Sequence, residues 1–332
     1  MSFTSYKAMV VRENPDGSFS RQIETRTIDD LPPGEVLIRV QYSSLNYKDA
    51  LSASGHKGVT RKYPHTPGID AAGVVEDSRH PDFSPGDPVL VTGYDLGQNT
   101  SGGYGQYIRV PAEWVIKISG KLTPETAMML GTAGFTAALG IHHLQFHNIT
   151  PESGKIIVTG ASGGVGSMAV ALLSHLGYEV TAVSGKKEAY PMLQELGASD
   201  ILDREQFRDD ESRPLLPGRW AGAIEAVGGN YLSKVIRETK LHGVVTCCGN
   251  IASLKVETSI FPFILRGVSL IGIDSANQDR AVRELLWQHL GSDWFTEKIK
   301  IPIRKVSLEH LNPEIDTILK GGQLGRVLVD MG

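Results

Sequence analysis

The feature of this sequence that most constrains its fold is a glycine-rich stretch at residues 155–173, KIIVTGASGGVGSMAVALL. It opens with an apolar run at 156–158, passes through four glycines and continues into residues that favour a helix. A strand, a tight glycine turn and a helix N-terminus in this order are typical of a dinucleotide-binding site, where backbone N–H groups face a pyrophosphate. A plain tight turn is the less favoured alternative. The predicted turn glycines are Gly160, Gly163, Gly164 and Gly166.

Around this turn, the second half of the chain alternates between strand and helix patterns. Further strands are expected at 179–183, 221–227, 243–248 and 268–273, and helices at 164–176, 187–196 and 279–290. Such alternation builds a doubly wound parallel sheet with helices on its faces. We therefore predict an α/β nucleotide-binding domain at 125–297.

The first part of the chain has a different pattern, with short strands separated by many turns. Strand signals occur at 6–11, 35–42, 73–75 and 87–91. This spacing predicts a small β-barrel domain at 1–124. The tail at 322–330 is also strand-like, so we expect 298–332 to return and complete the barrel domain. The irregular segment 44–73 is rich in proline and glycine, which predicts a functional loop rather than a linker.

Composition argues against several classes of function. The net charge is −4, and charges of one sign form no long block, so we expect no nucleic-acid partner and no anionic membrane surface. The N-terminal residues lack the apolar core of a signal peptide, and no apolar run is long enough to span a bilayer. Cys247 and Cys248 are neighbours, so we expect no structural disulfide between them. These features together favour a cytoplasmic protein.

The end of the second expected strand indicates which nucleotide binds. NAD-specific sites place a carboxylate about twenty residues beyond the glycines, where it accepts the ribose hydroxyls. Here the strand ends in Ser184, Gly185 and Lys186, and the first acid is Glu188. A hydroxyl, a glycine and lysine ammonium groups suit a 2′-phosphate, so we predict NADPH as the cofactor.

Seven motifs give the chain a resemblance to a known family. They are SSLNYKDAL (43–51), PGIDAAG (67–73), GTAGFTAA (131–138), VTGASGGVG (158–166), LGASD (196–200), PFILRGVSLIGIDS (262–275) and LGRVLV (324–329). With these motifs the chain resembles the medium-chain dehydrogenases/reductases along essentially its whole length. Within them it is similar to the zinc-free quinone oxidoreductase branch and its acrylyl-CoA reductase subgroup. The resemblance implies a GroES-like barrel, an inserted Rossmann domain and a homodimer joined at about 268–273.

The resemblance also implies site residues. Tyr47 resembles a cofactor-contacting tyrosine, and Asn46 is its neighbour on the nicotinamide side. Lys186 stands where the family often has arginine, which keeps the charge and loses the two-pronged geometry. The other candidate cofactor contacts are Thr132, Ser162, Val165, Ser184, Gly185, Arg204, Cys248, Gly249, Asn250, Ile273, Asp274 and Arg326.

A catalytic zinc ion is not expected. Zinc sites of alcohol-oxidising relatives use Cys and His ligands, and the first 246 positions contain no cysteine. The histidine and glutamate of their Gly-His-Glu motif fall in the stretch that is PGID (67–70) here, and its Ile69 cannot ligate. His143 and His147 are spaced by four residues, which is more typical of a solvent-facing helix surface than of a metal site. We predict no metal.

A metal-free reductase suits an acceptor that carries its own electron sink. We expect NADPH to deliver hydride to the β-carbon of a short α,β-unsaturated acyl thioester such as acryloyl-CoA. Asn46 and Tyr47 are the candidate polar groups near the reacting atoms, and Asp70 is the candidate organiser of their loop. Tyr47 as a packing ring and Asp70 as a turn-stabilising carboxylate remain alternatives. A quinone or general enone reductase is the second candidate function, and a non-catalytic NADPH-binding sensor the third.

Overall fold

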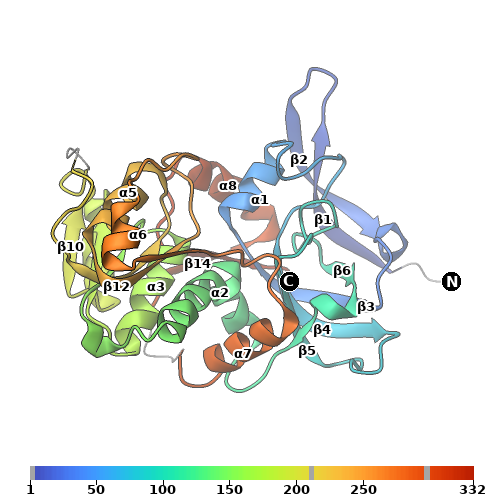
Figure 1. The fold of residues 1–332 in the computed structure, drawn as a ribbon. Helices are drawn as coiled ribbons and strands as arrows, with labels where there is room; N and C mark the ends of the chain where they lie inside the picture. The colour runs from blue at the N-terminus through green and yellow to red at the C-terminus, as the bar shows by residue number, and fades with distance from the viewer. Residues whose placement is uncertain (1–3, 209–212, 295–299) are drawn as a thin grey trace. The chain divides into compact units, whose positions relative to one another are not determined.

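The computed structural model describes residues 4–208, 213–294 and 300–332 (Figure 1). The chain divides into two compact units. Unit 1 comprises Met1–Thr132, Ala276–Ser292 and Ile303–Gly332, and unit 2 comprises Ala133–Ser275 and Asp293–Pro302. The domain boundaries expected at 124 and 297 stay predictions.

Unit 2 contains the parallel sheet that the alternating patterns predicted. Its described strands are β8 (Ile156–Val158), β9 (Val180–Ser184), β10 (Asp200–Asp203), β11 (Trp220–Glu225), β12 (Thr239–Cys247) and β13 (Ser269–Gly272). They follow the order β10-β9-β8-β11-β12-β13, and neighbours pair in parallel. The strand order reverses between β8 and β11, and in such sheets ligands bind at the carboxyl ends of the strands at this switch point. The glycine turn directly follows β8 and so lies at that position.

Helices complete unit 2. They are α3 (Gly164–His175), α4 (Tyr190–Glu195), α5 (Gly229–Glu238), α6 (Phe261–Arg266) and the part of α2 (Pro124–Phe146) beyond Thr132. Every residue of β8, β9 and β11 is buried, as expected for strands covered on both faces. Ile157, Ala223 and Val245 of adjacent strands share one apolar core with Val235 of α5.

Unit 1 is built on a mixed sheet. The strands are β14 (Ile303–Ser307), β15 (Arg326–Asp330), β3 (Val36–Ser44), β4 (Asp70–Ser78), β5 (Pro88–Thr92) and β7 (Ile116–Lys117) in spatial order, with β6 (Tyr107–Val110) also on β3. β15 pairs antiparallel with β3 and parallel with β14, so the tail returns to the N-terminal strands as its pattern predicted. A separate antiparallel pair is formed by β1 (Ser5–Glu13) and β2 (Phe19–Thr27). The predicted α/β fold, with a strand-rich domain and a doubly wound parallel sheet, is confirmed.

The helices of unit 1 come from separate parts of the chain. They are α1 (Tyr47–Ala53), the start of α2, α7 (Arg280–Leu290) and α8 (Asn312–Leu319). The guanidinium of Arg283 in α7 donates hydrogen bonds to the Thr92 and Ala276 carbonyl oxygens at 2.8 and 2.7 Å. It also lies 4.2 Å from the ring centroid of Tyr94, which stacks on Trp114. These contacts hold α7 in unit 1.

The remaining elements are short. Single 3-10 turns lie at Ile28–Asp30, Ala112–Trp114, Pro151–Ser153, Lys187–Ala189 and Leu308–His310. Where the chain is described, its helices are too short or too polar to cross a bilayer.

Candidate functional site

In unit 2 the glycine turn has the shape that a pyrophosphate site requires. The turn leaves β8 through Gly160, which has a positive φ of 60°, and α3 begins at Gly164. A Cβ atom on Gly166 would lie 2.3 Å from the Gly160 carbonyl oxygen, so only glycine lets the helix start against the turn. The Ala161 N–H donates to the Val183 carbonyl oxygen at 3.1 Å and fixes the turn to β9. The residues here therefore fit a bound dinucleotide.

A buried carboxylate that the sequence analysis missed braces this turn. Glu225 ends β11 with no exposed surface, and its Oε1 accepts hydrogen bonds from Thr159 Oγ1 at 2.9 Å and from the Val227 N–H at 3.0 Å. The Gly228 N–H donates to both of its oxygens. Burial raises the pKa of Glu225. These hydrogen bonds join the loops after β8 and β11. In the sequence, the sign of this buried carboxylate was a single acid in the otherwise apolar segment WAGAIE.

The predicted 2′-phosphate residues lie together beside the turn. Ser184 Oγ donates to Ser162 Oγ at 3.1 Å, and the Lys186 N–H donates to Ser184 Oγ at 3.1 Å. A Cβ atom on Gly185 would lie 2.7 Å from the guanidinium carbon of Arg204, so that side chain rests over Gly185. Partial burial lowers the pKa of the Lys186 ammonium. Two hydroxyls, the backbone of Lys186 and the Arg204 guanidinium thus lie at the end of β9.

The other candidates of unit 2 follow β12 and β13. The Cys248 N–H donates to the Glu225 carbonyl oxygen at 2.9 Å, and the Ile273 N–H donates to the Cys247 carbonyl oxygen at 2.9 Å. Burial raises the pKa of the Cys248 thiol to about 12, so the thiol stays protonated. Both cysteines of the sequence are described, and both are free thiols in this structure. The loops after these strands contain Gly249, Asn250 and Asp274. Asn250 and Asp274 are exposed.

In unit 1, Asp70 is the centre of a buried polar cluster. Its carboxylate begins β4 with no exposed surface and accepts hydrogen bonds from Ser44 Oγ at 2.5 Å and from Asn46 Nδ2 at 2.8 Å. The Thr132 N–H and Oγ1 donate to it at 2.9 and 2.5 Å. Three predicted site residues, Asn46, Asp70 and Thr132, are therefore in direct contact. We call Ser44, Asn46, Asp49, Asp70 and Arg326 the Asp70 cluster.

Asp49 is the second carboxylate of the cluster. Asn46 is the N-cap of α1, and Asp49, at the third position of the helix, accepts the Asn46 N–H at 2.8 Å. Its other oxygen accepts the Ile69 N–H at 2.7 Å. Burial, and then the charge of Asp70, raise the pKa of Asp49 to about 7. The sequence analysis did not name Asp49, although the Asn-x-x-Asp spacing was a capping signal.

Arg326 supplies the positive charge of the cluster. Its side chain is 2% exposed, and its guanidinium donates to Asn46 Oδ1 at 3.1 Å and to Ser44 Oγ at 2.8 Å. It also donates to the carbonyl oxygens of Leu45 and Met129, each at 3.3 Å. Its Nη2 lies 4.0 Å from Asp70 Oδ2. We predicted Arg326 as a cofactor contact, but its donors form hydrogen bonds within the protein, one of them to Asn46.

Gly131 permits this close packing. It has a φ of 53° and interrupts α2, so the Thr132 N–H points to Asp70. A Cβ atom on Gly131 would lie 2.5 Å from Asp70 Oδ2, 2.6 Å from Ser44 Oγ and 2.8 Å from Arg326 Nη2. Any side chain there would collide with the cluster.

Tyr47 differs from its neighbours because it faces outward. It is the first residue of α1 and is 44% exposed, and within the described residues its hydroxyl has no hydrogen-bond partner. The hydroxyl is therefore available to a ligand.

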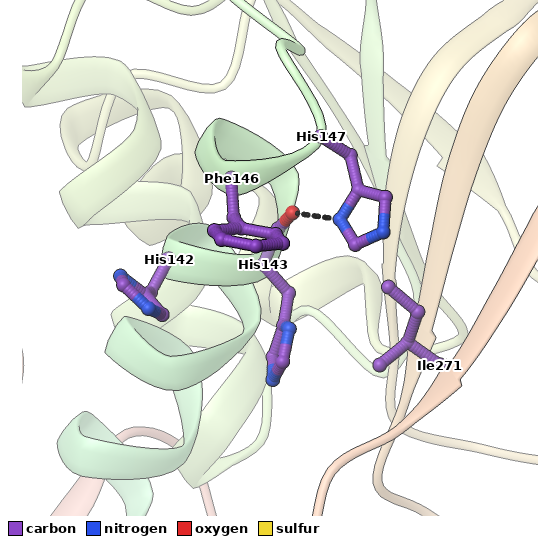
Figure 2. A pocket seen from close by; sticks show the side chains of 5 residues that line it. All are labelled: His142, His143, Phe146, His147 and Ile271. Carbon is purple, nitrogen blue, oxygen red and sulfur yellow. Dashed lines mark hydrogen bonds between the residues drawn. The ribbon is translucent and has the colours of Figure 1, made fainter. Parts of the chain in front are cut away.

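The three histidines near the end of α2 do not converge on one point. Figure 2 shows His142, His143 and His147 around Phe146, with side chains that point in different directions, beside Ile271 of β13. His147 Nδ1 lies 2.9 Å from the His143 carbonyl oxygen, so this nitrogen carries a proton. In the part of the chain that the structure describes, no three His, Cys, Asp or Glu side chains are grouped to hold a metal ion.

Comparison with known proteins identifies similar chains. Residues 32–120 match the family described as Alcohol dehydrogenase GroES-like domain, and residues 164–290 match Zinc-binding dehydrogenase. The chain is 42% identical over 327 residues to Acrylyl-CoA reductase AcuI of Ruegeria pomeroyi, covering 98% of this chain and 99% of that protein. The solved structure of the yhdH oxidoreductase from Salmonella enterica in complex with NADP has a TM-score of 0.95 and 40% identity, covering 98% of this chain and 100% of that one. Bacillus subtilis yhfP with NAD bound has a TM-score of 0.95 and 39% identity, covering 98% and 99%.

Proposed function

Because this chain belongs to the medium-chain dehydrogenase/reductase family of NAD(P)-dependent oxidoreductases, we propose that it reduces the C=C bond of a short α,β-unsaturated acyl thioester with NADPH. The observation that carries the proposal is the full-length similarity to an acrylyl-CoA reductase at 42% identity. Acryloyl-CoA is the proposed acceptor. A quinone or another enone is the second candidate, since the same site chemistry suits it.

The choice of NADPH over NADH rests on the end of β9. Ser184, Gly185, Lys186 and Arg204 would hold a 2′-phosphate, because hydroxyl donors, the backbone of Lys186 and the Arg204 guanidinium lie at that position. The turn at Gly163 and Gly164 would hold the pyrophosphate at the start of α3.

A zinc ion does not fit the Asp70 cluster, although one matched family carries zinc in its description. Zinc needs Cys, His or carboxylate ligands around one point. Ile69 cannot ligate, and the Asp70 carboxylate already accepts hydrogen bonds from Ser44, Asn46 and Thr132. The proposed reaction therefore uses no Lewis acid from the protein.

The protein residues bind and orient the reactants. When bound, NADPH supplies a hydride, which adds to the β-carbon of the acceptor while a proton adds to the α-carbon. Tyr47 would donate a hydrogen bond to the acyl oxygen, where negative charge develops during the reaction. Asp70 would hold the loop that carries Asn46 and Tyr47, through the contacts described above.

We also propose a homodimer. β13 is the last strand at one edge of the described sheet, and Leu270 on it is 40% exposed. Ile264 and Leu265 of the preceding helix α6 are 64% and 58% exposed. An apolar edge of this kind suits pairing with a second copy.

The test is NADPH oxidation with acryloyl-CoA, crotonyl-CoA and a benzoquinone, with NADH as the matched control. We expect the highest kcat/KM with acryloyl-CoA and NADPH. Turnover with the quinone alone would replace the proposed acceptor and keep the reductase class. Tight NADPH binding without any turnover would favour a cofactor-binding sensor instead.

A further inference from the structure

We propose that Glu225 is a positioning residue of the dinucleotide site, and that its negative charge sets the affinity for the cofactor pyrophosphate by fixing where the glycine turn begins. Glu225 acts through Thr159, the residue before the turn. The inference rests on the proposed NADPH site and not on the choice of acceptor. The residues that carry it all lie in unit 2.

Every described hydrogen-bond partner of the Glu225 side chain is a donor. Its Oε1 accepts the Thr159 hydroxyl at 2.9 Å and the Val227 N–H at 3.0 Å. The Gly228 N–H donates to both carboxylate oxygens, at 2.9 and 3.0 Å. The Thr159 hydroxyl itself accepts the Ala226 N–H at 3.0 Å, so its one hydrogen is directed to Glu225. These hydrogen bonds favour the ionised carboxylate and oppose the rise in its pKa that burial causes.

Thr159 connects this carboxylate to the glycine turn. Its N–H donates to the Ile224 carbonyl oxygen at 3.1 Å, so both its backbone and its side chain are held by the end of β11. The next residue, Gly160, has a φ of 60°, and its carbonyl oxygen accepts the Gly163 N–H at 3.0 Å. Gly163 is the N-cap of α3, where the pyrophosphate is proposed to bind. A displacement of Thr159 would therefore move the N–H groups at the start of α3.

The loop after β12 is joined to the same residue. The Glu225 carbonyl oxygen accepts the Cys248 N–H at 2.9 Å. The Ala252 N–H donates at 2.9 Å to the carbonyl oxygen of Val227, whose own N–H is bound to the Glu225 carboxylate. The loops after β8, β11 and β12 therefore meet at Glu225, at the edge of the sheet where the strand order reverses.

Glu225→Gln keeps the size of this side chain and removes its charge. An amide has one acceptor oxygen, so its NH₂ group takes the place of one carboxylate oxygen. In either orientation the NH₂ group faces the Gly228 N–H, because that group donates to both oxygens of Glu225. Two donors that face each other separate, and a neutral oxygen holds the Thr159 hydroxyl less strongly than a charged one. We therefore expect the turn to lose its fixed position.

The primary test compares two ligands on Glu225→Gln. NADPH carries the pyrophosphate, and 2′-AMP carries the adenosine and its 2′-phosphate without a pyrophosphate. We expect the Kd for NADPH, measured by fluorescence where the variant is fully folded, to rise about tenfold, the size of one lost hydrogen bond to a charged group. The Kd for 2′-AMP, measured by calorimetry, should stay unchanged. An unchanged NADPH Kd, or an equal loss for both ligands, would overturn the proposal.

Glu238→Gln is the matched control, because Glu238 is a second buried carboxylate of unit 2. It is 4% exposed, accepts Trp220 Nε1 at 2.9 Å and lies 3.1 Å from Lys234 Nζ. It is the last residue of α5, whereas Glu225 precedes that helix. We expect Glu238→Gln to lower Tm and to leave the Kd for NADPH unchanged. If both variants weaken NADPH binding equally, Glu225 contributes only general stability and the proposal is wrong.

Variants of Thr159 decide the matter if Glu225→Gln does not fold. Thr159→Val has a similar shape without the hydroxyl, and Thr159→Ser keeps the hydroxyl. We expect Thr159→Val to raise the Kd for NADPH and not that for 2′-AMP, and Thr159→Ser to bind NADPH as the unmodified protein does. Equal NADPH affinities of the two variants would refute the connection through Thr159.

These outcomes do not depend on which acceptor is reduced. A lack of turnover with acryloyl-CoA would leave the inference standing, whereas an unmodified protein that binds no NADPH would overturn both the proposed cofactor and the inference.

Discussion

Replacing Gly131 with alanine should destabilise unit 1 by more than the cost of placing a side chain on this unusual backbone conformation. The backbone there has a φ of 53°, and the added Cβ would lie 2.5 Å from Asp70 Oδ2 and 2.6 Å from Ser44 Oγ. With a ψ of −156° this backbone lies where residues other than glycine are rare, and a side chain there costs about 1 kcal/mol or more. Crowding a filled interior adds about 1–3 kcal/mol, and the Asp70 cluster cannot easily move, because its members are hydrogen-bonded to one another. We expect a total of about 3 kcal/mol.

Gly17→Ala is the matched control. Gly17 has a φ of 80°, but nothing lies within 4 Å of the position its Cβ would occupy. It therefore measures the backbone term alone, about 1 kcal/mol, and the difference of about 2 kcal/mol belongs to the collision with the cluster.

Differential scanning calorimetry can measure both variants. At about 2–4 °C per kcal/mol for a domain of this size, Gly131→Ala should lower Tm by about 6–12 °C and Gly17→Ala by about 2–4 °C. Equal losses in the two variants would refute the reasoning, because they would mean that the cluster yields freely to a methyl group.

Three further predictions concern charge and cofactor binding. Because burial raises the pKa of Asp49 to about 7, its contribution to stability is complete below about pH 4 and is lost as pH rises to 7, by at most about 4 kcal/mol. Urea unfolding across this range should show the loss in the unmodified protein and not in Asp49→Asn, and parallel curves would contradict it. Arg204→Ala should raise the Kd for NADPH about tenfold and leave that for NADH unchanged, by fluorescence titration; equal effects would remove Arg204 from the phosphate site. Gly163→Asp should abolish NADPH binding by placing a carboxylate against the pyrophosphate, and retained binding would disprove the turn's role.

The parallel sheet was predictable because its central strands are buried on both faces. β8, β9 and β11 are mostly apolar segments, and such segments stand out in a sequence. β10 and β2 were not predicted, because their residues are only partly buried and their patterns are correspondingly mixed. The apolar period of a strand is visible only where burial demands it.

The candidate site was predictable in part, for a similar physical reason. The glycine turn and Ser184–Lys186 are local in sequence, so their composition signals their chemistry. The bond between Arg326 and Asn46 joins residues 280 positions apart, and no local pattern encodes it. A glycine at position 131 indicated a possible break in the helix. The reason why only glycine fits there is that a Cβ would collide with Asp70 and Ser44, and this is visible only in the folded chain.

The place of β15 in its sheet has a consequence for biosynthesis. β15 lies between β3 and β14, and it carries Arg326, the guanidinium that faces Asp70 and Asn46. A ribosome makes β3 and Asp70 long before Arg326, so the nascent unit 1 holds Asp49 and Asp70 before the guanidinium that faces them is made. The strands that the structure describes in unit 2 are all synthesised by Gly272. A chain stalled before Arg326 should therefore contain a folded unit 2 that resists protease beside an unfinished unit 1 that does not.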